Sequence, residues 1–165
     1  PKGYDHKYVY SHFGYNLKAT DMQAAIGCAQ LEKFPTFVER RKHNFARLKE
    51  ALLVAQDRLI LPEAAENADP SWFGFLITCR NGVDRNSVVR YVESKGVQTR
   101  MLFAGNLTKH PCFDEMRKTG EGYRIVGTLK NTDRIMNDTF WIGVYPGMSD
   151  EMIDYMAKTI LEAIG

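Results

Sequence analysis

A polar turn that runs directly into a capped helix is the part of this sequence best suited to chemistry. Residues 14–16 read Gly-Tyr-Asn, and Lys18 follows shortly after. Thr20 can cap a helix, because Gln23 stands three residues later and its side chain can reach back to the cap. The helix then carries a run of small residues that permits close packing: Ala24, Ala25, Gly27, Cys28 and Ala29. Asn16 and Lys18 are therefore candidate ligand contacts held by a rigid base. The residues leave a second interpretation open, in which Asn16 only forms the turn.

Two polar residues near the end of an apolar segment form a second candidate group. Arg100 is a cation within an apolar strand, so it lies at an edge or faces a phosphate or carboxylate. Asn106 follows Gly105, which indicates either a plain turn or a donor and acceptor directed at a sugar or phosphate.

Several familiar chemistries are absent from the sequence. It contains no GxGxxG, GxxxxGK[ST], GxSxG or HExxH motif. His6 and His12 lie near Asp5 without a helical register that would bring them together, so we predict no metal site there. The three cysteines have neither metal-ligand spacing nor an even disulfide count, which is typical of reduced, mostly buried thiols in a cytoplasmic protein.

Length and charge limit the function classes. The chain has 165 residues, a net charge of +2, 44% hydrophobic residues and 25% charged residues, as in an ordinary globular protein. The small net charge predicts neither a nucleic-acid nor a membrane partner, and no apolar run is long enough to span a bilayer. Because the sequence starts at Pro1 rather than Met, we expect it to be a piece of a longer chain.

The pattern of apolar residues predicts an α+β fold. We expect residues 1–13 to be extended, a helix at 21–33, and a second helix that Pro35 separates from it. A loop at 57–70 precedes predicted strands at 72–79, 97–103 and 140–144, which alternate with helices that start at Asp84 and Ser149 and near residues 113 and 132. We therefore predict a helical arm over residues 1–58 and, over 59–165, a small, mainly antiparallel sheet with helices on one face.

Residues 14–33 resemble the signature of the sugar-nucleotide aminotransferase family, which are vitamin B6 enzymes with the aspartate-aminotransferase-type fold. Most members carry Arg where this chain has Lys18. Residues 3–12, together with 71–75 and 99–106, are similar to the iron–sulfur 3-dehydrase branch that acts on CDP-4-keto-6-deoxy-D-glucose. The resemblance covers essentially the whole chain and corresponds to the C-terminal part of a subunit more than twice as long.

The resemblance implies an activity and its cofactors. The branch removes the C3 hydroxyl of the sugar in 3,6-dideoxyhexose and lipopolysaccharide O-antigen biosynthesis, using pyridoxamine 5′-phosphate where the aminotransferases use pyridoxal phosphate. It implies that the catalytic position and the cysteines of a [2Fe-2S] cluster lie before Pro1. We therefore expect no catalytic residue, no metal site and no complete cofactor site in this chain, and no activity of the chain alone.

The resemblance also implies roles for particular residues. It assigns Asn16 to the cofactor phosphate of the other subunit in a homodimer, and Lys18 to the neighbourhood of the cofactor or sugar nucleotide. The residues that match the sugar-nucleotide pocket are Tyr10, His12, Tyr15, Arg100 and Asn106. A reductase is an implied partner, and nucleic acid and membrane are not.

Two other functions remain open at this stage. The first is the C-terminal portion of a pyridoxal-phosphate-dependent sugar-nucleotide aminotransferase, distinguished by Lys rather than His at the cofactor position. The second is a free-standing binding or interaction domain without catalysis. The residues before Pro1 would discriminate among them, and the present sequence fixes neither the nucleotide nor the final sugar.

Overall fold

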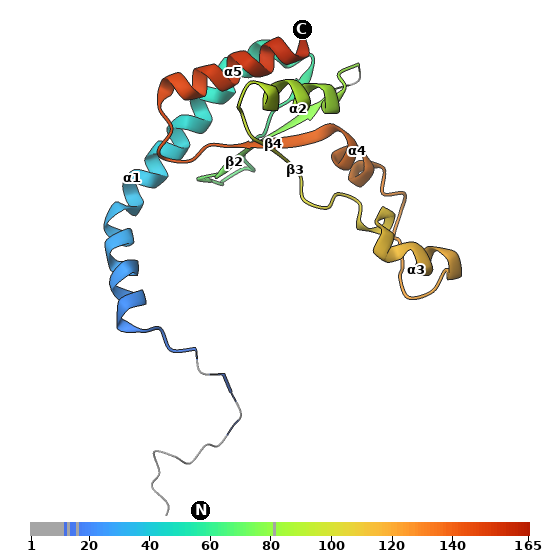
Figure 1. The fold of residues 1–165 in the computed structure, drawn as a ribbon, viewed down its shortest axis with the longest axis horizontal. Coiled ribbons are helices and arrows are strands. Elements are labelled where there is room, and N and C mark those ends of the chain that lie inside the picture. The colour runs from blue at the N-terminus through green and yellow to red at the C-terminus, as the bar shows by residue number, and fades with distance from the viewer. Residues whose placement is uncertain (1–11, 13, 16, 81) are drawn as a thin grey trace, which may run out of the picture. The chain divides into compact units, whose positions relative to one another are not determined.

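The computed structural model describes residues 12, 14, 15, 17–80 and 82–165 (Figure 1). Backbone contacts divide the chain into two compact units, residues 1–34 and residues 35–165. The predicted extended segment at residues 1–13 lies almost entirely outside the described residues. Among the described residues, no helix is long and apolar enough to cross a membrane.

The first helix, α1, spans Asp21–Leu52 without a break at Pro35. The prediction of two helices separated by this proline was therefore wrong. A proline inside a helix removes one backbone hydrogen bond, to the carbonyl four residues earlier, and crowds that carbonyl. Here that carbonyl belongs to Leu31, whose side chain is 69% exposed, and Pro35 is exposed as well. Water can satisfy the freed carbonyl, so the helix continues through Pro35.

The second unit contains a four-stranded antiparallel sheet in the order β1-β2-β4-β3. Its strands are β1 (Leu59–Ile60), β2 (Gly74–Cys79), β3 (Thr99–Met101) and β4 (Thr139–Gly143). Three of them overlap the predicted strands, whereas β1 lies in a segment predicted to be a loop. Its two residues pair with Cys79 and Thr78 at the sheet edge, and so short a strand leaves no alternating pattern to detect.

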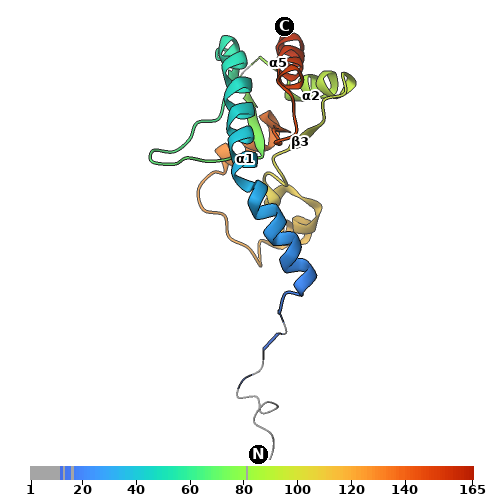
Figure 2. The ribbon, with the colours of Figure 1, turned by 90° about the vertical axis from the view of Figure 1, so that its left-hand side faces the viewer.

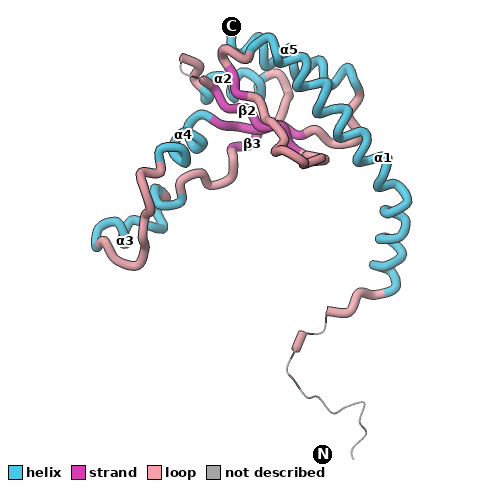
Figure 3. The backbone as a smooth tube through the Cα atoms, turned by 180° about the vertical axis from the view of Figure 1, so that it is seen from behind, coloured by secondary structure: helices cyan, strands magenta, loops and turns pink. Residues whose placement is uncertain are grey.

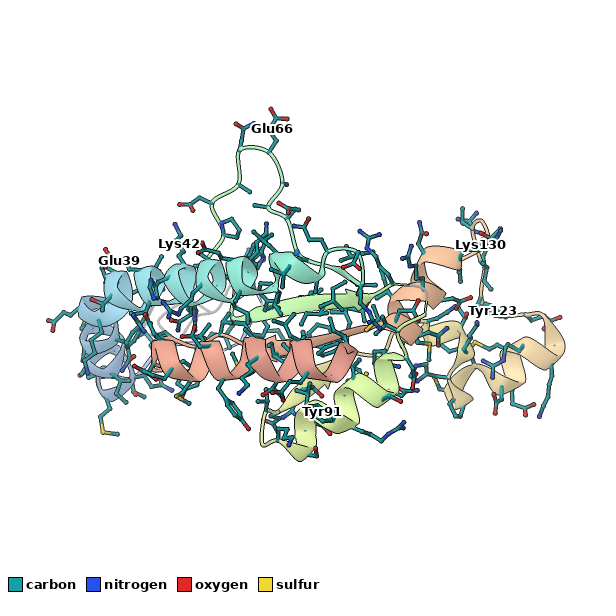
Figure 4. All side chains as sticks on the ribbon, turned by 90° about the horizontal axis from the view of Figure 1, so that it is seen from above. Glu39, Lys42, Glu66, Tyr91, Tyr123 and Lys130 are labelled. Atoms are coloured by element: carbon teal, nitrogen blue, oxygen red, sulfur yellow. The ribbon has the colours of Figure 1, made fainter. Side chains whose placement is uncertain are left out.

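Helices cover one face of this sheet, as predicted. Figure 4 shows the second half of α1, α5 (Asp150–Ile164) and α2 (Arg85–Ser94) side by side, and Figure 2 shows them on the same side of the strands. Strand β2 alternates accordingly: Phe75 and Ile77 are fully buried toward the helices, while Leu76 is 36% exposed on the other face. The fold thus matches the predicted α+β class.

The core between helices and sheet is continuous and apolar. Its largest fully buried side chains come from α1, α2, α5, the strands β1, β2 and β4 and the residue after β4: Phe75, Phe140, Leu48, Leu52, Leu59, Ile77, Ile142, Ile153, Ile160, Val88, Val92 and Val144. Burial of this kind stabilises a domain by about 25 cal/mol for each Å² of apolar surface removed from water.

Side-chain caps fix where the covering helices begin. Asp84 accepts hydrogen bonds from the backbone N–H groups of Asn86 and Ser87 at 3.2 and 3.0 Å, and Ser149 accepts one from Met152 at 3.3 Å. These caps satisfy backbone donors that the helix cannot pair. Both were predicted from the sequence and both are confirmed.

A mostly helical excursion joins β3 to β4. It contains the short turns η3 (Leu107–Lys109) and η4 (Pro111–Phe113) and the helices α3 (Asp114–Thr119) and α4 (Lys130–Asp138), which Figure 3 shows beyond the end of the sheet. The two helices agree with the short helices predicted in this region.

The two units defined by backbone contacts meet between residues 34 and 35, whereas the sequence predicted a domain boundary at residue 58. Residues 35–52 of α1 belong with the sheet, because Leu48 and Leu52 are fully buried in its core. The predicted boundary at residue 58 stays a prediction about the domains of the longer protein.

Candidate functional site

The start of α1 carries the predicted capping box. Thr20 N–H donates to Gln23 Oε1 at 2.9 Å, and Gln23 N–H donates to Thr20 Oγ1 at 3.3 Å. Two backbone donors of the first turn are therefore satisfied reciprocally. This arrangement fixes the point at which the polar turn enters the helix.

The candidate ligand contacts before this cap are solvent-facing where they are described. Tyr15 is 93% exposed, and His12 and Lys18 are exposed as well. Asn16 and Tyr10 lie outside the described residues, so their predicted roles remain predictions. An exposed ammonium such as that of Lys18 can meet a phosphate without first breaking a buried contact.

In the second unit, Arg100 lies on β3, opposite Trp141 of β4. Its guanidinium is exposed and donates to Thr99 O at 3.2 Å and, with the Gln98 amide turned to satisfy both groups, to the Gln98 oxygen at 3.0 Å. Arg100 also borders a shallow hollow of about 300 Å³ that Glu93 and Gln98 help to line. It therefore lies at a sheet edge, which is one of the two placements that the sequence left open, with its guanidinium exposed.

Asn106 is placed differently from the expected pocket residue. Its side chain is only 3% exposed, its Oδ1 accepts from Thr108 N and Oγ1 at 3.2 and 2.6 Å, and its Nδ2 donates to Asp133 Oδ1 at 2.6 Å. Because both ends of the amide are engaged, a direct hydrogen bond to a sugar or phosphate would require breaking these contacts. The geometry supports a positioning role, in which Asn106 holds the loop after β3.

Asp133 and Lys109 belong to the same group of contacts that holds the loop after β3. Sequence reasoning did not identify either residue. Lys109 Nζ lies 2.9 Å from Asp133 Oδ1, and the donors from Asn106 and Lys109 hold the pKa of Asp133 below its usual range. Asp133 stands on α4, far from Asn106 in sequence, so no local spacing links them. A carboxylate in the first turn of a predicted helix was the only available signal.

The same loop is held closely by its backbone. Gly105 has a positive φ of 59°, and a Cβ on it would lie 2.6 Å from Met136 Cγ, so only glycine fits there. His110 Nε2 lies 2.6 Å from Ala104 O. His110 is thus tied to its own loop.

The cysteines form no cluster. Cys28 and Cys112 are exposed and Cys79 is buried, and burial raises the pKa of the Cys79 thiol to about 11. Within the described part of the chain, no group of three or more His, Cys, Asp or Glu side chains is arranged to hold a metal. The sequence interpretation of mostly buried thiols was therefore right only for Cys79.

A second hollow of the second unit adjoins the one that Arg100 borders, because both are lined by residues 96–98. It has a volume of about 460 Å³ between α5 and the strand ends, and its apolar lining includes Met148, Met152, Met156 and Tyr155. Met156 is buried, whereas Met152 is 47% exposed at the hollow.

The fold and the sequence together define the class of protein. Residues 1–161 match the model of the DegT/DnrJ/EryC1/StrS aminotransferase family, so the chain belongs to that family. This confirms, at the level of the family, the resemblance that the signature around Asn16 carries.

Individual relatives narrow the likeness further. The chain is 54% identical over its full length to the lipopolysaccharide biosynthesis protein RfbH of Salmonella typhimurium. It is 48% identical over 99% of its length to the dTDP-4-dehydro-2,6-dideoxy-D-glucose 3-dehydratase of Saccharopolyspora spinosa. It spans 37% and 35% of these two proteins, so it corresponds to little more than a third of their length.

Solved structures confirm the fold. A GDP-4-keto-6-deoxy-D-mannose-3-dehydratase from E. coli, with bound hydrated PLP, superposes with a TM-score of 0.75 over 93% of this chain and 38% of its own, at 24% identity. The DesV protein of S. venezuelae gives a TM-score of 0.77 over 97% of this chain and 40% of its own, at 19% identity. At such identities the likeness extends to the fold alone.

Proposed function

We propose that this chain is the C-terminal portion of a vitamin B6-dependent sugar-nucleotide 3-dehydratase that acts in lipopolysaccharide biosynthesis. The reaction is loss of the C3 hydroxyl from a 4-keto-6-deoxysugar carried on a nucleoside diphosphate. The substrate we favour is CDP-4-keto-6-deoxy-D-glucose, on the way to 3,6-dideoxyhexoses.

The observation that carries this proposal is the ranking of the relatives. Identity is 54% to RfbH and 48% to a dTDP-sugar 3-dehydratase, but 31% to the putative pyridoxal phosphate-dependent aminotransferase EpsN and 23% to a dTDP-sugar transaminase. The first two alignments also cover 100% and 99% of the chain, against 65% for EpsN. A difference of this size favours the dehydratase branch over the aminotransferases.

The residues of the first unit fit the phosphate end of the cofactor. Lys18 is an exposed cation at the entry to a capped helix, and cations and helix starts both favour phosphate. In the proposal, Lys18 and Asn16 hold the phosphate of pyridoxamine 5′-phosphate in the partner subunit of a homodimer. When bound, the cofactor supplies an electron sink for departure of the hydroxyl. The [2Fe-2S] cluster and a reductase partner belong to the proposal only for the longer protein.

The residues of the second unit fit recognition of the sugar nucleotide. Arg100 offers an exposed guanidinium to the diphosphate, and Asn106 holds the adjoining loop in place through Asp133. From the first unit, the proposal adds Tyr10, His12 and Tyr15 as residues that line the sugar site. None of these residues abstracts a proton in the proposal, because the catalytic position is expected in the longer protein.

The proposal is tested with the full-length protein, purified and loaded with pyridoxamine 5′-phosphate. CDP-4-keto-6-deoxy-D-glucose is added, and the product is followed by mass spectrometry and by ¹⁸O labelling at C3. We expect the C3 label to leave as water; release of the free 3-deoxy sugar also requires two electrons and two protons, which the proposed reductase partner supplies. The matching dTDP substrate, assayed in parallel, establishes which nucleotide is preferred.

Two outcomes would support the other functions. A product that keeps the C3 label and gains an amine from an amino donor would identify an aminotransferase. Nucleotide binding without turnover, in protein shown to hold the cofactor, would indicate a binding domain. Either result would overturn the dehydratase assignment.

A further inference from the structure

The excursion between β3 and β4, residues 102–138, extends beyond the sheet and has almost no core of its own (Figure 3). Asn106 is its one buried residue, and every other residue in it is partly or fully exposed. Helices as short as α3 and α4 are not stable alone, and here they bury little apolar surface. The position of the excursion relative to the sheet therefore depends largely on the contacts at its two ends.

Arg85 lies at both of these ends. Its Nη1 donates to Thr139 O at 3.1 Å, where the chain re-enters the sheet, and also contacts Met101 Sδ, where the chain leaves it. Its Nη2 donates to Met136 O in the last turn of α4 at 3.4 Å. Among the residues that the structure describes, this bond to α4 is the only side-chain hydrogen bond between residues 102–138 and a residue outside them.

The charge of Arg85 suits α4 better than it suits its own helix. Arg85 is the first residue of α2, where the positive end of the helix dipole disfavours a cation. At the end of α4 the last carbonyl groups have no partner within the helix and carry partial negative charge, which a guanidinium complements. The planar fork of the guanidinium also reaches two carbonyl oxygens at once, which the compact ammonium of lysine does not do in a fixed plane.

Helix α4 connects this contact to the loop after β3. Asp133 lies one turn before Met136 on α4 and accepts the hydrogen bond from Asn106 Nδ2 at 2.6 Å. The Asn106 N–H donates to Met136 Sδ at 3.4 Å, and a Cβ on Gly105 would lie 2.6 Å from Met136 Cγ. The loop after β3 is therefore held against α4, and Arg85 holds α4 against the sheet.

We propose that Arg85 is a positioning residue for recognition of the sugar nucleotide. It clamps both ends of the excursion, and through α4 it holds the loop after β3 in place next to Arg100. This inference rests on the proposed function, in which Arg100 meets the diphosphate and Asn106 holds the adjoining loop. Arg85 itself touches no substrate in the proposal. Its loss should therefore weaken binding of the sugar nucleotide and leave the chemical step nearly unchanged.

The test uses the full-length protein loaded with pyridoxamine 5′-phosphate, unaltered and as Arg85→Lys and Arg85→Met. The rate at which the C3 ¹⁸O label of CDP-4-keto-6-deoxy-D-glucose leaves as water is measured in single turnovers at several concentrations of excess enzyme. These rates give a half-saturating concentration and a maximal rate. We expect the half-saturating concentration to rise about ten-fold in Arg85→Met and several-fold in Arg85→Lys, while the maximal rate changes by less than about two-fold. Cofactor content should stay equal in all three proteins.

Arg90→Met is the matched control, because it removes one positive charge from the same helix. Arg90 donates to Ser87 Oγ at 3.0 Å and lies 4.0 Å from Asp84, both at the start of α2, so its loss should leave both kinetic values unchanged. Hydrogen exchange of the same proteins without substrate, followed by mass spectrometry, tests the clamp directly. Residues 102–110 should exchange faster in both Arg85 variants and at the unaltered rate in Arg90→Met.

Unchanged exchange in Arg85→Met would overturn the proposal, because the excursion would then be held without the clamp. Faster exchange with an unchanged half-saturating concentration would overturn it too, as would a fall in the maximal rate alone or an equal loss in Arg90→Met. If Arg85→Met does not fold, Arg85→Lys decides by the same criteria. If the unaltered protein releases no label from any sugar nucleotide, the proposed function fails, and the exchange data still decide whether Arg85 clamps the excursion.

Discussion

The two units of this chain differ in how much of their surface is buried. Every described residue from 12 to 34 is exposed, and this stretch of helix is held by backbone bonds and the Thr20–Gln23 box alone. Residues 35–165 enclose a continuous core with fully buried residues on α1, α2, α5 and the sheet. The second unit therefore stabilises itself, whereas the first derives little of its stability from this chain.

The first unit exposes apolar side chains on more than one side of α1. Met22 and Ile26 lie on one side of α1 and Leu31 lies on another, yet they are 78%, 65% and 69% exposed. A helix that is apolar on several sides is normally buried. We infer that residues 21–34 find their packing in the longer protein, where the polar turn before them is proposed to meet the cofactor.

The largest expected effect is the difference in unfolding free energy between one core mutation in the second unit and one mutation in the first. Phe140→Ala empties a fully buried position in the central strand and should cost about 3–5 kcal/mol of unfolding free energy. Ile26→Ala, in the first unit, should change it by less than about 0.5 kcal/mol. Urea unfolding of the 165-residue chain, followed by tryptophan fluorescence, measures both. A large loss for Ile26→Ala would contradict the comparison.

A smaller effect tests how closely the sheet of the second unit is packed. A Cβ on Gly74 would lie 2.6 Å from Trp141 Cε3, so Gly74→Ala should cost about 1–3 kcal/mol. Gly143 pairs with Gly74 across the strands and has open space around it, so Gly143→Ala is the matched control and should be neutral or slightly stabilising. Equal effects of the two substitutions on urea unfolding would show that the indole does not occupy this place.

The contact between α1 and α5 should make the second unit sensitive to acid. His43, Arg47 and Arg40 hold the pKa of Asp150 below its usual range, the largest cause being the hydrogen bond from His43. A lowered folded pKa means that this stabilisation is complete above the ordinary aspartate value of about 3.9 and is lost as the pH falls through the folded value.

Asp150→Asn isolates this contribution. We expect the variant to be less stable than the unaltered chain at pH 7, and the difference to shrink as the pH falls below about 3.9. Urea unfolding at several pH values measures it. A difference that stays constant down to low pH would show that the charge of Asp150 plays no part.

The smallest effect belongs to the first unit. Thr20→Ala removes one half of the capping box and should weaken the first turn of α1 by about 0.5–1 kcal/mol. Hydrogen exchange should report faster exchange at residues 21–24 while urea unfolding of the second unit stays unchanged. A change in that unfolding would mean that the two units are coupled more strongly than the contacts indicate.

Local rules predicted most of the elements because their causes are local. The caps at Asp84, Ser149 and Thr20 and the alternation along β2 could be found within a few residues of sequence. The rule that failed was also local: Pro35 was taken to end a helix, but an exposed carbonyl can be satisfied by water. Strand β1 was missed because only its pairing defines it.

The site was harder to predict because its contacts are distant in sequence. Arg100 lies at a sheet edge, one of the two placements that its sequence context left open. The burial of Asn106 could not be predicted, because its side chain pairs with Asp133 of α4, 27 residues away. Asn16 and Tyr10 lie outside the described residues, so the roles that the family resemblance implies for them stay predictions.

The central claim is that the polar turn of the first unit serves a vitamin B6 cofactor in the longer protein. The most direct measurement is a titration of pyridoxamine 5′-phosphate into the full-length protein and its Asn16→Ala and Asn16→Gly variants. A charge-assisted hydrogen bond to phosphate is worth about 1.5–3 kcal/mol, so both variants should bind about ten-fold more weakly or worse. Normal affinity in Asn16→Gly would contradict the claim, because glycine restores the freedom of a turn but not the amide.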